Sequence, residues 1–317
     1  MHDRAILFHF GALGDVLISL PCIRFLKAIG YSVTLVASFP QALLLKELDE
    51  VDDVINASSS VLSDIYVNPK KSDILSSYSE VFIFSKSFEP ELFKILKANN
   101  IVVRLIHTYP FKRVSNYKYQ LTQLIEALSI NLDKIDDLST YFKPFNLSSD
   151  ILEKDITISV HLGSGSEVKN LPLFTILKYI KEINRLYNPR WLFITGPAEA
   201  PQRKLFVEDL VFKLKDRAFH LDSYPLLSVA NYIKSSSLFI GNDSGISHLA
   251  AFCSTKSILC FGPTDPKIWA PPFSWVKYIL SKKDCAPCGD YHKCQIKDCM
   301  GFVSVEELIG YSLKLFN

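Results

Sequence analysis

The sequence contains no run of about 18 apolar residues, the length that a membrane-spanning helix requires. Its N-terminus, MHDRAILFHFGALGD, lacks the basic stretch, apolar core and small-residue cleavage site of a signal peptide. An excess of charge of one sign is also missing, because 35 Lys and Arg residues face 33 Asp and Glu residues, giving a formal net charge of +2. Composition therefore indicates neither a membrane-spanning nor a nucleic-acid-binding protein, and we expect a cytoplasmic chain.

A disulfide framework is not indicated either, because the chain has an odd number of cysteines, seven in all. Three of them, Cys22, Cys253 and Cys260, lie within apolar segments, as small core residues would. Internal repeats and low-complexity segments are absent from the sequence. The 317 residues, 48% hydrophobic and 21% charged, suit a folded protein with two domains of ordinary size.

Strand-like and helix-like segments alternate along the chain, a pattern that predicts α/β domains with parallel sheets. The pattern lapses over residues 136–155, a polar stretch with Pro144, where we place a linker. We therefore expect an N-terminal domain over residues 1–145 and a C-terminal domain over residues 155–303. A last helix, over residues 304–317, is suggested to pack back on the N-terminal domain. Two such halves normally leave a ligand-binding cleft between them.

The first candidate site is FHFGALGDVLISLP, where Gly11 and Gly14 follow a strand and Asp15 opens a helix. By itself, Asp15 is most simply a helix cap, since aspartate there accepts backbone N–H bonds. The competing interpretation is a catalytic base at the carboxyl edge of the sheet. A dinucleotide site is disfavoured, because Gly11-x-x-Gly14 is not G-x-G-x-x-G and the second strand ends at Ser38 without an acidic residue.

The second candidate is HLGSGSEVKNLP, a turn of small residues that can bring backbone N–H groups close to an anion. Lys169 follows the turn just before a helix, but no Gly-Lys-Ser/Thr completes a P-loop. A glycine turn beside a surface lysine is common, and His161 at the strand end is more simply a packed or hydrogen-bonded histidine. The turn itself consists of Gly163, Ser164, Gly165 and Ser166.

The third candidate is FITGPAE, in which Glu199 opens a helix after a turn. An acidic residue in the first turn of a helix is favourable without any ligand. Glu199 is also an acceptor suited to a ribose hydroxyl.

The fourth candidate, GNDSGISHLAAF followed by FGPTDP, is the most specific. Ser244 and Gly245 begin a helix whose free N–H groups form an anion site, and Gly245 lets a phosphate approach the backbone. Asp243 is expected to brace the loop by accepting N–H bonds. His248 either reaches the ligand or packs beneath it, and packing is favoured. Thr264, after the next strand, offers a hydroxyl to the same ligand, for which a diphosphate fits.

The last candidate is CAPCGDYHKCQIKDC, with Cys285, Cys288, Cys294, Cys299 and His292. The C-x-x-C pair suits zinc, but the second pair is spaced by four residues and the loop is short. A reduced, irregular surface loop is favoured over a zinc site.

Together these segments resemble glycosyltransferase family 9, the ADP-heptose:lipopolysaccharide heptosyltransferases. The motifs GALGDVLISLPCIRFLK, HLGSGSEVKNLP, GPAE and GNDSGISHLAAF…FGPTDP…WAP carry the resemblance, in the right order over nearly the whole chain. It implies the GT-B fold, with two Rossmann-like domains facing a central cleft, the nucleotide sugar on the C-terminal domain and the acceptor on the N-terminal one. It also implies an inverting reaction that needs no metal and no cofactor.

The resemblance assigns roles to individual residues. It makes Asp15 the catalytic base, and it sets Lys169 against the donor phosphates. It places Asp243, Ser244 and Gly245 around the diphosphate and Glu199 at the ribose. The remaining donor-side candidates are Gly163, Ser164, Gly165, Ser166, His248 and Thr264.

On the acceptor side, the segment YPFKRVSNYKYQ is only loosely similar to the family. Its Lys112 and Arg113 are candidates for contacts with acidic sugars or phosphates, together with Gly14; the competing interpretation is solvated surface charge. The implied donor is ADP-heptose, and the implied acceptor is a lipopolysaccharide core or lipid A–Kdo. No nucleic acid partner is expected, and such an acceptor leaves room for peripheral contact with the cytoplasmic face of the inner membrane.

Two other functions stay open at this point. One is a GT-B enzyme that uses another nucleotide sugar, either a UDP-sugar transferase or a nucleotide-sugar 2-epimerase. The other is a non-catalytic protein that binds a nucleotide sugar.

Overall fold

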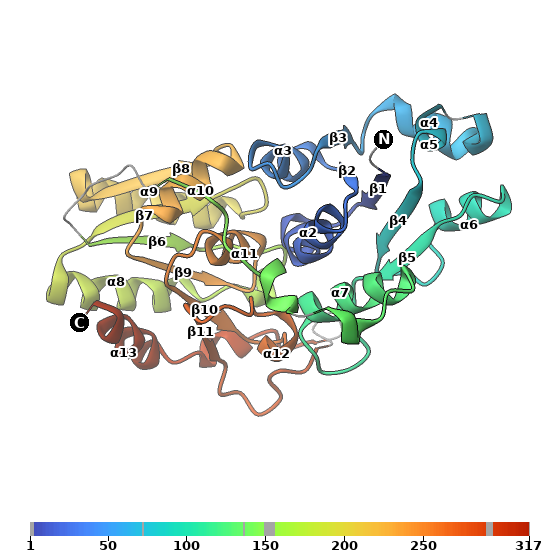
Figure 1. Ribbon diagram of the computed structural model, residues 1–317. Coiled ribbons are helices and arrows are strands. Elements are labelled where there is room, and N and C mark those ends of the chain that lie inside the picture. The colour runs from blue at the N-terminus through green and yellow to red at the C-terminus, as the bar shows by residue number, and fades with distance from the viewer. Residues whose placement is uncertain (1–2, 72, 136, 149–155, 290–293, 317) are drawn as a thin grey trace. The chain divides into compact units, whose positions relative to one another are not determined.

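The computed structural model describes residues 3–71, 73–135, 137–148, 156–289 and 294–316. The chain divides into two compact units, Met1–Lys143 (unit 1) and Pro144–Asn317 (unit 2). Each unit has one sheet, and every strand pairing in both sheets is parallel (Figure 1). The prediction of two parallel α/β halves is confirmed. Within the described ranges, no helix is both long and apolar enough to cross a membrane.

The sheet of unit 1 has five strands in the order β3-β2-β1-β4-β5. Its central strand, β1, pairs on both sides, so that Leu7 lies opposite Leu35 and Phe82. Five consecutive buried residues in β1 explain why the sequence there reads as an unbroken apolar run. The strands are β1 (Arg4–His9), β2 (Ser32–Ala37), β3 (Asp53–Asn56), β4 (Glu80–Ser85) and β5 (Arg104–His107).

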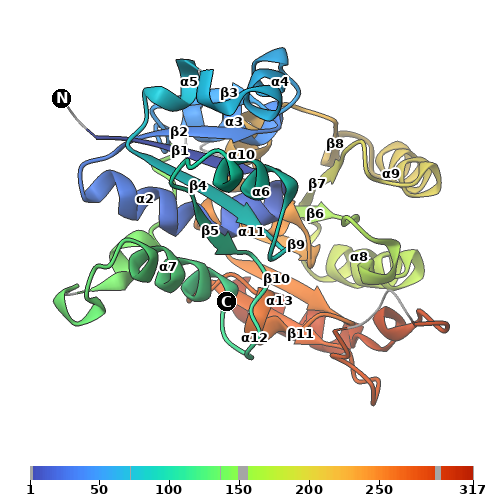
Figure 2. The same ribbon diagram turned by 90° about the vertical axis from the view of Figure 1, so that its right-hand side faces the viewer.

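The helices of unit 1 cover this sheet, and α2 and α7 lie side by side in both views (Figures 1 and 2). A cluster of apolar residues from α4, α5 and α6 packs with the side chains of Ile6, Phe8 and Ile83. The helices are α1 (Leu13–Ile18), α2 (Leu20–Ala28), α3 (Phe39–Glu47), α4 (Ser60–Val67), α5 (Asp73–Ser76), α6 (Glu91–Ala98) and α7 (Asn116–Ala127).

The helical periodicity after Val16 predicts one helix, but the structure has two, α1 and α2, which meet at Ser19. Pro21 has no N–H to donate to the carbonyl of Leu17, so the helix cannot continue unbroken. The same periodicity predicts that the helix ends at Gly30. This glycine does follow the end of α2, with a left-handed φ of +100° that glycine adopts at low cost.

The sheet of unit 2 has six strands in the order β11-β10-β9-β6-β7-β8. The sequence predicts four of them, from the apolar runs ITISVHLG, RWLFITG, SLFIGND and SILCFG, but not the edge strands β8 and β11. The strands are β6 (Thr157–His161), β7 (Arg190–Thr195), β8 (Ala218–Asp222), β9 (Leu238–Asn242), β10 (Ser257–Phe261) and β11 (Val276–Leu280). Because β9 and β10 are neighbours, the loops that follow them meet at one edge, as expected.

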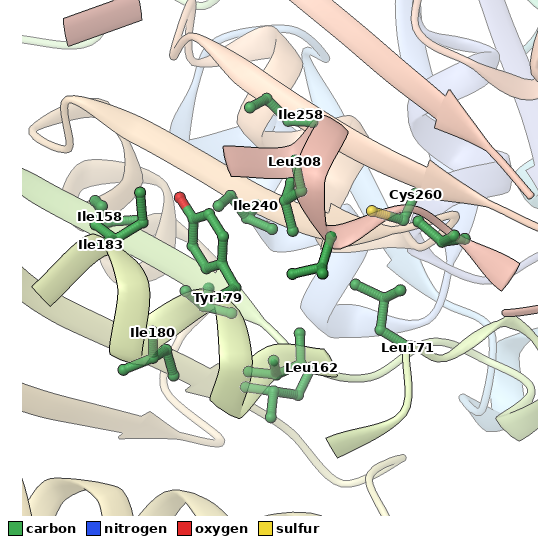
Figure 3. Close-up of a cluster of buried hydrophobic side chains, with 14 of the residues drawn as sticks. Ile158, Leu162, Leu171, Tyr179, Ile180, Ile183, Ile240, Ile258, Cys260 and Leu308 are labelled. Atoms are coloured by element: carbon green, nitrogen blue, oxygen red, sulfur yellow. The ribbon is translucent and has the colours of Figure 1, made fainter. Parts of the chain in front are cut away.

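The main core of unit 2 lies between its sheet and two helices, α8 and α13 (Figure 3). Ile158, Ile240 and Ile258 project from three strands toward this core, and Cys260 is buried among them, as predicted. The helices of unit 2 are α8 (Leu173–Tyr187), α9 (Pro201–Leu214), α10 (Leu226–Lys234), α11 (Gly245–Phe252), α12 (Pro266–Trp269) and α13 (Val305–Phe316).

The C-terminal helix α13 packs on α8, and the two lie side by side in Figure 1. Leu308 of α13 is fully buried in the core, and the hydroxyl groups of Tyr179 and Ser312 are 2.8 Å apart. This helix therefore belongs to unit 2. That it packs back on the N-terminal domain stays a prediction.

The boundary between the units falls inside the predicted linker. The ring of Tyr141 packs on Phe25, and the guanidinium of Arg24 donates to the carbonyl of Lys143, which ties this part to unit 1. Two residues later, the N–H of Phe145 donates to the carbonyl of Phe252 at 2.7 Å, within unit 2.

Candidate active site

The sheet of unit 2 has a topological switch point between β6 and β9, where the direction of strand addition reverses. In open α/β sheets, ligands bind at such a point beyond the carboxyl ends of the strands, because the two following loops diverge. The loop after β6 belongs to the second candidate, HLGSGSEVKNLP, and the loop after β9 belongs to the fourth, GNDSGISHLAAF. The structure therefore brings together two candidates that are far apart in the sequence.

Lys169 and Asp243 form an ion pair across the switch point of unit 2. The Nζ of Lys169 lies 3.1 Å from Oδ2 of Asp243, and the side chains are 15% and 9% exposed. We had expected Asp243 to accept N–H bonds from its own loop, but the structure shows the ammonium as its partner. An incoming phosphate would compete with Asp243 for this ammonium, since both are charged acceptors.

Helix α11 begins directly after this aspartate. Ser244 is its N-cap, with an extended backbone and a hydroxyl oxygen that accepts the N–H of Ser247 at 3.3 Å. The first N–H groups of an α-helix have no partner within the helix, and they attract anions. Gly245, the first helical residue, adds no side chain at this position.

His161 joins the helix start to a buried carboxylate. Its Nδ1 lies 3.1 Å from the hydroxyl oxygen of Ser244, and its Nε2 lies 3.2 Å from Oε1 of Glu199. This histidine is buried, in agreement with the interpretation as a hydrogen-bonded residue. It therefore connects the loops after β6, β7 and β9.

Glu199 is enclosed, with a side chain that is only 3% exposed. Burial raises the pKa of Glu199, but the hydrogen bonds from His161 and from the N–H of Gly196 outweigh burial and leave the pKa below its ordinary value. A Cβ on Gly163 would lie 1.7 Å from Oε1 of Glu199. Glycine at position 163 is thus required by the packing of this carboxylate.

The turn after β6 is closed by serine. The hydroxyl of Ser164 donates to the carbonyl of Ser166 at 2.6 Å and accepts the N–H of Ser166 at 3.2 Å. A Cβ on Gly165 would meet no described atom within 4 Å, so the space beside its backbone is open. This loop can therefore be approached closely by a ligand at Gly165, whereas Gly163 is packed.

Asn242 is a residue whose role the sequence analysis missed. Its amide nitrogen donates to the carbonyls of Leu162 and Gly163 at 3.1 and 3.2 Å, and its Oδ1 accepts the N–H of Leu171 at 3.0 Å. It therefore fixes the loop after β6 to the end of β9. The signal that could have identified Asn242 is a polar residue at the end of a buried strand.

Thr264 and His248 complete the donor-side candidates. Thr264 follows β10, is 7% exposed, and its hydroxyl has no hydrogen-bond partner among the described residues. His248 lies inside α11 and is buried, which agrees with the packing interpretation. Of the two, only Thr264 carries an unused hydrogen-bonding group.

Unit 1 has its own switch point, between β1 and β4. Asp15 follows β1 and is the third residue of α1, not its N-cap, which is Ala12. Its Oδ2 accepts the N–H of Ala12 at 3.1 Å, so the carboxylate stabilises the helix start from inside the helix. Gly14 also lies within α1 rather than in the turn that we expected.

The other oxygen of Asp15 faces a cation that the sequence analysis missed. Nζ of Lys86, after β4, lies 3.8 Å from Oδ1 of Asp15, whose side chain is 21% exposed. The pair spans the switch point of unit 1, as Lys169 and Asp243 span that of unit 2. No sequence pattern linked the two positions, which are far apart in the chain.

The predicted acceptor-side cations are exposed. Lys112 and Arg113 lie in the loop after β5, next to the exposed Phe111. The ring of Phe111 stacks on Phe88 with centroids 5.2 Å apart, and His107 packs against both. The loops after β4 and β5 thus present aromatic and basic side chains together.

The cysteine-rich segment is partly described. Cys285, Cys288, Cys294 and Cys299 carry free thiols and line one small cavity of about 50 Å³. No three histidine, cysteine or acidic side chains of the described ranges are arranged to hold a metal. His292 lies outside those ranges, and both the surface-loop and the zinc interpretations stay predictions.

The comparisons with known proteins agree with these features. Residues 220–297 match the sequence model of glycosyltransferase family 9 (heptosyltransferase). The matched range contains β9, α11 and β10, with the loop around Gly245. The resemblance to this family is confirmed.

Solved structures confirm the fold over the whole chain. A glycosyltransferase of family 9 from Veillonella parvula is similar with a TM-score of 0.77 and 14% identity, covering 99% of this chain and 97% of that one. The ADP-heptose lipopolysaccharide heptosyltransferase II of Escherichia coli is similar with a TM-score of 0.75 and 13% identity, covering 98% of both chains. The fold of this chain is therefore GT-B, as expected.

One curated relative shares part of the sequence. It is an uncharacterized transmembrane protein of Dictyostelium discoideum, 27% identical over 123 residues. The match spans 38% of this chain and 55% of the length of that protein.

Proposed function

We propose that this chain, with its family 9 match and its GT-B fold, is an inverting heptosyltransferase that uses ADP-heptose and a lipopolysaccharide inner-core acceptor. One observation carries the proposal. An enclosed lysine and the N-terminus of α11 meet at the switch point of unit 2, where Lys169 pairs with Asp243. Positive charge at this point suits a diphosphate.

The donor would bind with its diphosphate at the start of α11. Gly245 leaves the backbone accessible there, and the ammonium of Lys169 lies at the neighbouring loop. When the bond to the sugar breaks, negative charge grows on the departing ADP. Positive charge that is already in place stabilises this transition state without reorganisation.

Two further groups would hold the donor. The hydroxyl of Thr264, which has no partner in the part of the chain that the structure describes, can donate to a phosphate oxygen. Glu199 is ionised, with each oxygen accepting one hydrogen bond, from His161 or from Gly196. Because a carboxylate has about four acceptor sites, it retains capacity for a ribose hydroxyl.

Asp15 would act as the base. It removes a proton from an acceptor hydroxyl while that oxygen attacks the anomeric carbon from the face opposite ADP. The N–H of Ala12 holds Oδ2, which leaves Oδ1 to the substrate. Nζ of Lys86 lies 3.8 Å from Oδ1, so a cation stands beside the oxygen that we assign to the acceptor hydroxyl.

The acceptor would be recognised by unit 1. Inner-core acceptors carry carboxylate and phosphate groups, and Lys112 and Arg113 are exposed cations in the loop after β5. Contact with an acidic sugar is therefore the role that we assign to this loop, with Gly14 beside the base.

The test is product formation from ADP-heptose and lipid A–Kdo, with ADP release and product mass measured together. We expect one heptose to be added with inversion at the anomeric carbon, read by NMR. Thermal stabilisation by ADP, UDP and NADH should be compared in parallel, because only a ligand of the folded state raises the melting temperature. Stabilisation by UDP and not by ADP, or binding of ADP-heptose without transfer to any acceptor, would overturn the proposal.

A further inference from the structure

A series of buried polar side chains in unit 1 takes no part in the proposed chemistry. It begins at His9, the last residue of β1, whose Nδ1 accepts the N–H of Gly11 at 3.2 Å. Burial lowers the pKa of His9 to about 4, so the ring is neutral at neutral pH. Since Nδ1 accepts, the proton is on Nε2, which faces the hydroxyl oxygen of Ser19 at 3.0 Å.

The series continues in one direction. The hydroxyl of Ser19 donates to Oε1 of Gln120 at 2.6 Å. The amide nitrogen of Gln120 donates to Oδ1 of Asn116 at 3.1 Å. The amide nitrogen of Asn116 donates to the carbonyl of Thr108 at 2.9 Å. Each group donates to the next, and all of these residues are buried.

A satisfied buried network often does no more than specify how a core packs. Contacts at the two ends of this network indicate a role beyond packing. At the first end, a Cβ on Gly11 would lie 2.8 Å from the ring of His9 and 2.6 Å from Cβ of Asp15. Gly11 therefore lies between His9 and the proposed base, Asp15. A shift of the histidine ring would displace Gly11 and, with it, Asp15.

The middle of the series also reaches the base. The hydroxyl oxygen of Ser19 lies 3.1 Å from the carbonyl oxygen of Asp15, and the N–H of Ser19 donates to the same carbonyl at 3.3 Å. The hydroxyl of Ser19 has one proton, and it donates this proton to Oε1 of Gln120 because that oxygen is the nearer acceptor. The backbone of Asp15 is therefore packed directly on the network.

At the other end, Thr108 follows β5 and opens the loop that carries Lys112 and Arg113. Its own N–H donates to the carbonyl of Ser85 at 3.0 Å, at the end of β4. The network thus connects the loop of the proposed base to the loop of the proposed acceptor contacts.

We propose that four residues are positioning residues that hold the Gly11–Asp15 loop and the loop after Thr108 in one fixed relation: His9, Ser19, Gln120 and Asn116. They touch no reacting atom. Their effect is on where the Asp15 carboxylate stands when the acceptor is bound. This inference rests on the proposed role of Asp15.

Gln120→Met is the first variant, because it keeps the side-chain length and removes both hydrogen bonds. Hydrogen exchange of the intact protein, without substrate, should show amide protection falling roughly tenfold both at Gly11 and over residues 108–113. The control is Tyr78→Phe, which removes a partly buried hydrogen bond to Thr34 elsewhere in unit 1. Tyr78→Phe should leave amide protection at Gly11 and over residues 108–113 unchanged. If amide protection falls at only one of the two loops, or at neither, the proposal is overturned.

Kinetics provide the second measurement. Ser19→Ala should lower kcat roughly tenfold to a hundredfold through misplacement of the base, with the KM for the donor unchanged. Ser19→Thr, which restores the hydroxyl, should recover most of the rate. If Ser19→Ala retains the parental kcat, or if Ser19→Thr is as slow as Ser19→Ala, the network only packs the core.

The exchange experiment separates this inference from the proposed function. If the parental protein transfers no heptose but Gly11 and residues 108–113 respond together, the function is wrong and the coupling stands. The ¹⁵N shifts of His9 should also show a neutral ring protonated on Nε2. Protonation on Nδ1 would overturn the network's direction.

Discussion

The Nζ of Lys86 lies 3.8 Å from Oδ1 of Asp15, so a lysine after β4 faces a carboxylate after β1. The second oxygen of that carboxylate accepts the N–H of Ala12 at 3.1 Å. The two oxygens of Asp15 therefore have separate tasks. One stabilises the start of α1, and the other is the oxygen that we assign to the acceptor hydroxyl.

Replacing Asp15 by Asn separates these tasks. The amide oxygen can still accept the N–H of Ala12, so the helix start is retained, but the side chain cannot take a proton. We expect kcat to fall about 10²–10⁴-fold, the contribution of a positioned base. Single-turnover experiments measure the rate of transfer, and calorimetry measures the affinity for ADP, which should stay within about twofold of the parental value.

The matched control for that variant is Asp209→Asn, on the exposed face of α9, where the aspartate forms an ion pair with Lys213. It should transfer heptose at the parental rate. Parental turnover by the Asp15 variant would remove Asp15 from the mechanism.

Gly163→Ala tests the packing of the donor-side carboxylate. The added Cβ would lie 1.7 Å from Oε1 of Glu199, so the loop or the carboxylate must move. We expect a loss of about 1–3 kcal/mol in the free energy of unfolding, typical of an overpacked site. Urea denaturation measures it. Gly165→Ala, in the same loop, adds a Cβ that meets no described atom within 4 Å and should change stability little.

His9 makes stability depend on pH. Burial lowers its pKa from 6.5 to about 4 in the folded state, whereas the unfolded chain keeps the ordinary value. The unfolded state therefore binds a proton first as the pH falls, and stability is lost between pH 6.5 and about 4. The full difference corresponds to about 3 kcal/mol. Above pH 6.5, this group adds no pH dependence.

His9→Gln removes the titrating group and is the comparison for this effect. The gap between the unfolding free energies of parent and variant should narrow as the pH is lowered from 7 to 4.5. A gap that stays constant over this range would show that His9 titrates normally in the folded state.

The sequence predicted the parallel α/β plan because its central strands are buried on both faces and read as short apolar runs. Edge strands give a weaker signal. In β11, for example, Lys277 and Tyr278 are exposed, so VKYIL resembles a surface segment. The break at Ser19 was missed because helical periodicity continues through it, although Pro21 was the available clue.

The candidate site was predictable where glycine and polar residues directly follow buried strands, as at Gly163 and Gly245. Contacts between distant positions were not. The pairs Lys86–Asp15, Lys169–Asp243 and Ser19–Gln120 form only because β1 and β4, β6 and β9, and α2 and α7 become neighbours. A single sequence contains no local pattern for such pairs.

The proposed function depends on one electrostatic property, that the ammonium of Lys169 and the first amides of α11 receive a diphosphate. Calorimetric titration of ADP into the parent, Lys169→Met and Lys178→Met tests it most directly. Lys178 is an exposed lysine of the same unit, paired with Glu306. We predict that Lys169→Met weakens ADP binding by roughly tenfold or more, the loss of a charge-assisted contact, and that Lys178→Met does not. Equal ADP affinity in all three proteins would contradict the claim.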